Sequence, residues 1–167
     1  MIEIRLATSS DIPEIQKIAL ETWPLTFGEI LSKEQITYML DWMYSTEMLE
    51  NQMQYEGHIF LLAFDSDLKI FIGFAGIQHA AKDQKTKIHK LYIKAGQQGK
   101  GVGKKLVEHI QILATKINDQ ALFLNVNKYN EQAIKFYQYI GFIEVAQEVI
   151  DIGRGFVMDD YIMEKPL

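Results

Sequence analysis

The order of the expected elements predicts a mixed α/β fold with one central sheet. Segments that alternate apolar and polar residues, typical of strands, are interleaved with segments whose apolar residues repeat at helical spacing. They come in the order strand, two or more helices, three strands, helix, strand, helix, two strands, which suits a sheet with helices packed against it. The 167 residues, 48% of them hydrophobic, suit a single domain over residues 1–167.

The first third of the chain predicts one strand and then helices. Residues 2–6 alternate as a strand does, and a helical apolar repeat follows. Pro24 restricts the residue before it, so we expect this helix to break near Trp23. Two more helices are expected, one capped by Ser32 and a short one over residues 46–54.

The rest of the chain alternates between strands and helices. Asp65-Ser66-Asp67 predicts a hairpin turn between two of the strands. Asn130 is an expected N-cap, and Gly141 is the expected end of the same helix. The expected strands are residues 58–63, 70–79, 87–93, 121–126, 142–150 and 156–163, and the expected helices are residues 104–117 and 130–139.

A glycine-rich turn joins the strand over residues 87–93 to the helix that follows it. Its sequence is Gln98-Gly99-Lys100-Gly101-Val102-Gly103. Backbone N–H groups at a helix N-terminus point at whatever lies there, and the helix dipole adds partial positive charge. Glycines let the backbone close tightly around an anion. The turn therefore predicts a phosphorylated ligand.

The spacing of the glycines excludes two common phosphate-binding motifs. A P-loop needs Gly, four residues and then Gly-Lys-Ser/Thr, which no register provides. A dinucleotide fingerprint needs Gly-x-Gly-x-x-Gly, but the sixth residue from Gly99 is Lys104 and the sixth from Gly101 is Leu106. The spacing that does occur is Gln-x-x-Gly-x-Gly, starting at Gln98.

A second motif follows the strand over residues 121–126. It consists of Asn130, Ala133, the pair Phe136-Tyr137 and then Gly141-Phe142. Together with the glycine-rich turn, it resembles the GNAT superfamily of N-acetyltransferases over roughly the central third of the chain. The resemblance implies a mostly antiparallel sheet of about seven strands that splays between the fourth and fifth strands, with acetyl-CoA in the gap.

The resemblance also implies roles for residues of both motifs. The turn would hold the diphosphate of acetyl-CoA, and the strand before it would pair with the pantetheine arm and supply a backbone donor to the thioester oxygen. Tyr137 would lie near the sulfur as the general acid. The expected cofactor-binding residues are Leu91, Tyr92, Ile93, Gln98, Gly99, Lys100, Gly101, Val102, Gly103, Lys104, Asn130 and Tyr137.

His89 is the candidate general base and a candidate substrate contact. Strand alternation places it on the same face as Leu91 and Ile93. Many similar proteins have a glutamate at this position, and a histidine with a pKa near ~6.5 accepts protons at neutral pH. The alternative is a structural histidine whose ring nitrogens are satisfied by neighbouring groups.

The first third of the chain is aromatic and acidic, and Trp23 and Phe27 are the expected acceptor-binding residues there. Such a surface suits a cationic amine. The alternative is that the aromatic side chains pack inward and the acids face solvent. Parts of this region resemble the bacterial spermidine/spermine N-acetyltransferase branch, although His89 stands where such relatives tend to have a carboxylate. They are Glu21-Thr22-Trp23, Phe27, Glu34, Leu40 to Glu47 and Leu49-Glu50.

The amino-acid composition limits the reaction mechanisms, metal sites and binding partners that the chain can have. Without cysteine the chain has no thiolate metal ligand and no thiol nucleophile, so we expect direct attack in a ternary complex. No His, Asp and Glu spacing resembles a metal site, so none is expected. A net charge of −5 is poor for nucleic-acid binding, and no membrane segment or targeting signal is recognised, so the expected location is the cytoplasm.

These observations predict transfer of acetyl from acetyl-CoA to a primary amine, with a small amine or polyamine as acceptor. A peptide or protein amine, N-terminal or on lysine, is the alternative acceptor. A CoA-binding regulatory module without catalysis and a nucleotide-binding domain unrelated to CoA stay open as other classes. Similar proteins commonly form homodimers, and the sequence leaves the oligomeric state open.

Overall fold

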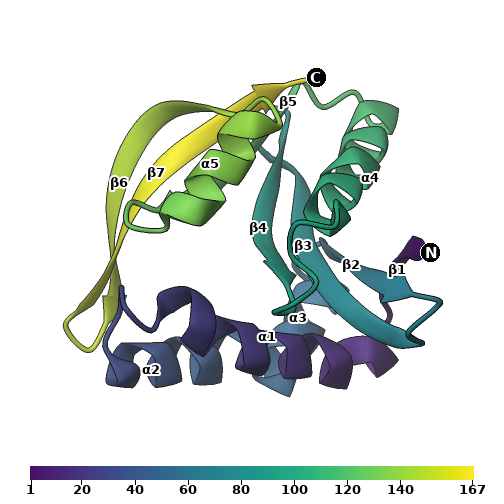
Figure 1. Ribbon diagram of the computed structural model, residues 1–167. Coiled ribbons are helices and arrows are strands. Elements are labelled where there is room, and N and C mark those ends of the chain that lie inside the picture. The colour runs from purple at the N-terminus through teal and green to yellow at the C-terminus, as the bar shows by residue number, and fades with distance from the viewer.

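The computed structural model describes residues 1–167 and contains one seven-stranded sheet (Figure 1). The strand order is β1-β2-β3-β4-β5-β7-β6, and every neighbouring pair is antiparallel except β4 and β5, which are parallel. This confirms the predicted mixed sheet. The strands are β1 Ile2–Leu6, β2 His58–Asp65, β3 Ile70–Lys82, β4 Lys85–Ile93, β5 Ala121–Asn127, β6 Ile143–Gly153 and β7 Phe156–Pro166.

Helices cover both faces of the sheet, and a hydrophobic core lies under each layer (Figure 1). The helices are α1 Ile12–Phe27, α2 Lys33–Met43, α3 Thr46–Gln54, α4 Val102–Lys116 and α5 Glu131–Tyr139, with a 3-10 turn at Ser9–Asp11. The α4 core includes Ile77, Ile88, Leu106, Ile110 and Leu122. The α1 core includes Ile15, Trp23, Leu49, Phe60 and Phe74. None of the helices has the combination of length and apolar character needed to cross a membrane.

The first helix continues through Pro24, so the predicted break near Trp23 is wrong. The hydroxyl of Thr22 donates to the Ile18 carbonyl at 2.8 Å, and the N–H of Gly28 donates to the Pro24 carbonyl at 3.0 Å. Proline removes only one N–H from the helix. Trp23 is 1% exposed, and its packing in the α1 core holds the helix together around the proline.

Local signals at other helix ends are confirmed. The Ser32 side chain accepts the Gln35 N–H at 3.1 Å, and the Asn130 side chain accepts the Ala133 N–H at 3.3 Å. Gly141 follows α5 with a φ of 101°, a conformation that favours glycine.

The two parallel strands separate along their length, which confirms the predicted splay. β4 and β5 pair only from Lys85 opposite Ala121 to Ile88 opposite Leu124. Beyond this point β4 stays paired with β3 up to Ile93, while β5 stays paired with β7. The second half of β4 therefore has a free backbone edge facing the gap, which is visible in Figure 1.

Candidate active site

The glycine-rich turn leaves the N-terminus of α4 without a capping side chain. Gly101 is its N-cap residue, with a φ of 78°, and Gly99 has a φ of 77°. A Cβ at either glycine would meet nothing within 4 Å, so the backbone conformation, not crowding, requires glycine. The first helical hydrogen bond runs from the Lys105 N–H to the Gly101 carbonyl. The three N–H groups before it are available to an anion.

Gly103 lets α4 and α5 approach each other closely. A Cβ at this position would lie 2.9 Å from Cζ of Phe136, which belongs to α5. The next residue of α5 is Tyr137. The close packing of the two helices therefore brings the anion-binding turn and this phenol to the same cavity.

That cavity, which we call the loop cavity, has a volume of about 460 Å³ and lies between the end of β4, the start of α4 and α5. The predicted cofactor-binding residues line it, except Lys100. Lys100 instead donates a hydrogen bond to Gln97 Oε1 at 3.0 Å, and Lys104 Nζ lies 3.9 Å from Glu108 Oε1. Both lysines are largely exposed, so their pairing adds little energy.

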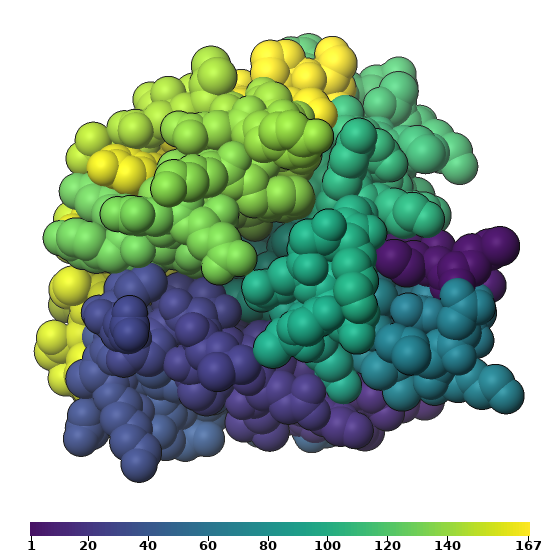
Figure 2. All heavy atoms as spheres, in the orientation of Figure 1, coloured from purple at the N-terminus to yellow at the C-terminus, as the bar shows by residue number.

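The loop cavity fits a diphosphate with an extended arm. No Asp or Glu lines it, whereas the α4 N-terminus and Lys104 supply positive potential. The free edge of β4 from Leu91 to Ile93 offers main-chain groups to an extended ligand. In the space-filling view, the teal turn, the green α5 and the indigo α1 meet in this region (Figure 2).

Tyr137 lies where the loop cavity meets a second cavity and lines both. Its ring packs on Phe136 and Phe142, with ring centroids 5.3 and 5.4 Å apart. Burial raises the pKa of the Tyr137 phenol above its ordinary value, so the phenol is protonated at neutral pH. A protonated, apolar-packed phenol at this junction is a hydrogen-bond donor to either side.

The second cavity, which we call the acceptor cavity, has a volume of about 340 Å³ and is lined on one side by α1 and α2. Trp23, Phe27 and His89, the predicted substrate-binding residues, all line it. The Trp23 ring lies 4.7 Å from Phe27 and 5.8 Å from Tyr92, centroid to centroid, so the wall is aromatic. The acids of this region face solvent, as the alternative interpretation expected: Glu21, Glu29, Glu34, Asp41 and Glu47 are exposed.

Two hydrogen bonds from α2 close one end of the acceptor cavity. The Tyr38 hydroxyl donates to the Ile152 carbonyl at 2.7 Å, and Gln35 Nε2 donates to the Val157 carbonyl at 2.9 Å. Gln35, Ile152 and Val157 line the cavity. The β6–β7 hairpin is therefore part of the acceptor side of the site.

The structure corrects the predicted orientation of His89. Gly76 of β3 lies opposite Lys90, but Ile77 lies opposite Ile88, so His89 is an extra residue on β4. Alternation breaks at this irregularity. Leu91 and Ile93 pack against the α4 core, whereas His89 stacks on the His58 ring on the opposite face, with centroids 4.5 Å apart.

The environment of His89 also changes its expected chemistry. Its Nε2 lies 3.2 Å from Gln78 Oε1. Burial, with further contributions from Lys87, His58 and Lys90, lowers the pKa of His89 to about 3. The ring is therefore neutral at pH 7 and a weak proton acceptor, unlike the histidine of ordinary pKa that the sequence argument assumed.

Several polar residues of the acceptor cavity escaped the sequence analysis. Lys90 is 4% exposed, and burial lowers its pKa to about 8. Asn125 and Asp160 also line the cavity. A signal for Asp160 was present, because it is an acid between Met158 and Ile162 in the same alternate row of β7.

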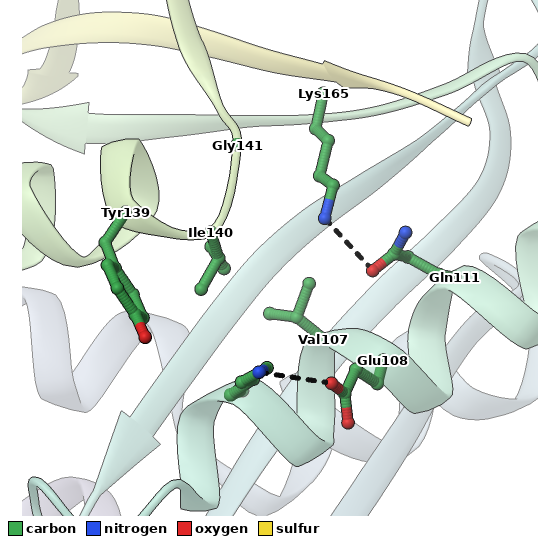
Figure 3. A pocket seen from close by; sticks show the side chains of 8 residues that line it. Val107, Glu108, Gln111, Tyr139, Ile140, Gly141 and Lys165 are labelled. Atoms are coloured by element: carbon green, nitrogen blue, oxygen red, sulfur yellow. Dashed lines mark hydrogen bonds and ion pairs between the residues drawn. The ribbon is translucent and has the colours of Figure 1, made fainter.

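A third pocket, of about 430 Å³, lies between α4 and the end of α5 (Figure 3). Lys165 Nζ donates to Gln111 Oε1 at 3.2 Å, and the pocket shares Lys104 and Tyr139 with the loop cavity.

No group of three or more His, Cys, Asp or Glu side chains is arranged to hold a metal ion.

The splayed sheet, the uncapped helix N-terminus and the phenol between two cavities define an acetyl-CoA-dependent N-acetyltransferase. The model of the acetyltransferase (GNAT) domain family matches residues 29–163. The chain belongs to this family of acyltransferases.

Three comparisons are the most informative about the site. A spermidine N(1)-acetyltransferase of Thermoplasma acidophilum is 31% identical over 98% of this chain and 96% of its own. The crystal structure of the PaiA N-acetyltransferase from the same organism, in complex with coenzyme A, superposes with a TM-score of 0.81 at 27% identity, covering 100% of this chain and 99% of the other. A peptidyl-lysine N-acetyltransferase of Salmonella typhimurium is 40% identical over 40% of this chain and 43% of its own.

Proposed function

We propose that this chain is a single acetyltransferase domain over residues 1–167 that transfers acetyl from acetyl-CoA to a small primary amine, with a polyamine as the first candidate. The observation that carries the proposal is the position of Tyr137 between two cavities of opposite character. One cavity has main-chain donors and no acid. The other is aromatic and contains a buried carboxylate.

The loop cavity is the proposed binding site for acetyl-CoA, which acts as a cosubstrate without a metal. In this proposal the N–H groups at the start of α4 bind the diphosphate, and the free edge of β4 from Leu91 to Ile93 pairs with the pantetheine arm. Asn130 lines both cavities at the start of α5 and contacts the same arm. The coenzyme A complex of the Thermoplasma PaiA protein supports this assignment.

The proposed reaction is direct attack of the amine on the thioester. Main-chain N–H groups of β4 stabilise the developing oxyanion, a contribution of the order of 3 kcal/mol for one such donor. Tyr137 donates its proton to the departing sulfur, in agreement with the raised pKa of the phenol. The acceptor is contacted by three residues that line the acceptor cavity: Trp23, Phe27 and His89.

A peptide lysine is the second candidate acceptor, and the partial match to the Salmonella peptidyl-lysine enzyme favours it. The small amine is preferred because the full-length match is to a spermidine enzyme and because α2 closes one end of the cavity. We also propose, from the composition and charge of the chain, a cytoplasmic location without binding to nucleic acid or membrane, and, from the resemblance, a homodimer.

Amine-dependent release of the CoA thiol tests the proposal. The protein is assayed with acetyl-CoA and a panel of polyamines, diamines, arylamines and lysine peptides, and calorimetry compares the binding of CoA, ATP and NAD. We expect CoA to bind best and a small alkylamine to accelerate thiol release most. Binding of CoA without acceleration by any amine indicates the regulatory module, and a preference for ATP or NAD removes the acetyltransferase assignment.

A further inference from the structure

We propose that Asp160, in the middle of β7, is the carboxylate that binds the ammonium group of the acceptor and accepts its proton. This inference rests on the proposed function and names the group that the acceptor site offers to a cationic amine. The resemblance led us to expect a carboxylate on β4, but this chain has His89 at that position. Asp160 supplies a carboxylate from β7 instead.

Asp160 lines the acceptor cavity from β7, which pairs with β5 across the gap from β4. It lies opposite Asn127 of β5 and opposite Glu148 of β6, so these three residues form a row across the sheet. It is 1% exposed and is the only Asp or Glu that lines the acceptor cavity. From the sequence we expected acidic residues of the N-terminal helices to attract the cationic amine. In the structure, the acidic residue in the cavity is Asp160 of the C-terminal hairpin.

The carboxylate of Asp160 is not in an ion pair, although Lys87 lines the same cavity. It forms no ion pair within 4 Å, and its one side-chain hydrogen bond comes from Asn125 Nδ2, 3.4 Å from Oδ2. The same amide also donates to Glu148 Oε2 at 3.1 Å. Burying a carboxylate without a partner costs several kcal/mol. A ligand ammonium in the cavity would offset this cost.

The charges around Asp160 favour a proton acceptor over a simple anchor. Burial is the main reason that its pKa is raised, and Glu148 and Asp159 act in the same direction. Asn125 and the Lys87 ammonium oppose the shift. A carboxylate with a raised pKa is better matched to an amine proton than one of ordinary pKa, whereas His89 is held neutral and weakly basic.

Asp160 and Tyr137 line the same cavity as Tyr92. Both lie close enough to the buried Tyr92 phenol to contribute to its raised pKa, and all three residues line the acceptor cavity. The proposed base therefore belongs to β7 and the proposed acid to α5, and both line the cavity into which Tyr92 of β4 also projects.

The proton balance of the reaction closes with these two groups. The ammonium gives one proton to Asp160, which passes it to water. The nitrogen lone pair then forms the C–N bond while the C–S bond breaks, and Tyr137 gives its proton to the sulfur. The second proton lost by the nitrogen restores the phenol. The products are an amide, a thiol and one released proton.

The test compares Asp160→Asn with Asp159→Asn. Asp159 is the neighbouring residue on the other face of β7, where its Oδ1 lies 3.0 Å from Lys128 Nζ, so it is a matched control. With spermidine as the acceptor, we expect Asp160→Asn to lower kcat/KM tenfold or more and Asp159→Asn to lower it less than threefold. Affinity for CoA should stay within twofold in both variants. A loss smaller than tenfold in Asp160→Asn overturns the assignment.

Thermal unfolding separates a functional carboxylate from a structural one. The raised pKa means that ionised Asp160 destabilises the folded state, so Asp160→Asn should unfold at the same temperature as the wild type at pH 7, or higher. A lower unfolding temperature with weakened CoA binding indicates a structural role and overturns the proposal.

Failure of this inference is distinguishable from failure of the proposed function. A wild-type protein that binds CoA but releases no thiol with any amine removes the function itself. An active wild type whose Asp160→Asn variant stays active removes only the assignment of Asp160.

Discussion

The loop cavity and the acceptor cavity adjoin at β4, yet they are built in opposite ways. The main-chain groups of the loop cavity come from one continuous segment, from the end of β4 to the first turn of α4, and α5 forms the opposite wall. The acceptor cavity is lined mainly by side chains from α1, α2, β4, β5, β6 and β7. The first arrangement suits a ligand that many related proteins share, and the second can change with the acceptor while the fold is retained.

The largest expected effect is at the junction of the two cavities. In Tyr137→Phe the sulfur loses its proton donor, so kcat should fall about 100-fold or more. CoA affinity should stay within about twofold, because no diphosphate contact is lost. Tyr129→Phe is the control, since Tyr129 is 66% exposed and lines neither cavity. Steady-state kinetics that show equal rates for Tyr137→Phe and the wild type would contradict the proposed acid.

A smaller effect is expected in the loop cavity alone. Gly101→Ala forces a non-glycine residue into a left-handed conformation at a cost of about 1–2 kcal/mol, which should weaken CoA binding about fivefold to thirtyfold. The value of kcat at saturating acetyl-CoA should be unchanged. Calorimetric titration with CoA measures the effect.

Gly155→Ala is the matched control for that prediction. Gly155 has the same φ of 78° and equally open surroundings, but it lies in the β6–β7 turn, away from the loop cavity. Both variants should lose similar stability, and only Gly101→Ala should lose affinity for CoA. Equal loss of affinity in both variants would show that strain acts through overall stability.

The acceptor cavity should respond to changes in its aromatic wall without any change in CoA binding. Trp23→Leu removes a cation–π surface worth about 0.5–1 kcal/mol, so the KM for a cationic amine should rise about twofold to fivefold. Phe60→Leu is the control for lost core packing, since Phe60 is 1% exposed and lines neither cavity. Amine kinetics that change equally in both variants would assign Trp23 to packing alone.

The difference in construction also explains how much the sequence could predict. The glycine spacing at the start of α4 and the motif of α5 are local, and they carry the family resemblance that implied the splayed sheet. All but one of the cofactor-binding residues predicted from that resemblance line the loop cavity. Lys100 does not line the cavity. The side chain of an exposed loop residue can bond to several neighbours, and that of Lys100 donates to Gln97.

The acceptor cavity was only partly predictable because it depends on long-range packing. Trp23 and Phe27 were found from composition, although the helix that carries them continues through Pro24. The extra residue at His89 reverses strand alternation, and no local signal in the sequence marks it. Asp160 reaches the cavity through pairing between β5 and β7, which are more than thirty residues apart in the chain.

The smallest expected effect concerns the stability of the acceptor side at low pH. The pKa of His89 is about 3 in the folded protein and near 6.5 in the unfolded chain, so the unfolded state binds more protons between these values. Stability is therefore unaffected above about pH 6.5 and falls as the pH decreases toward 3. His89→Gln removes this dependence, and its unfolding temperature should decrease less between pH 7 and pH 4.5 than that of the wild type. Equal decreases in the two proteins would show that His89 is accessible to protons in the folded state, which would restore it as a candidate base.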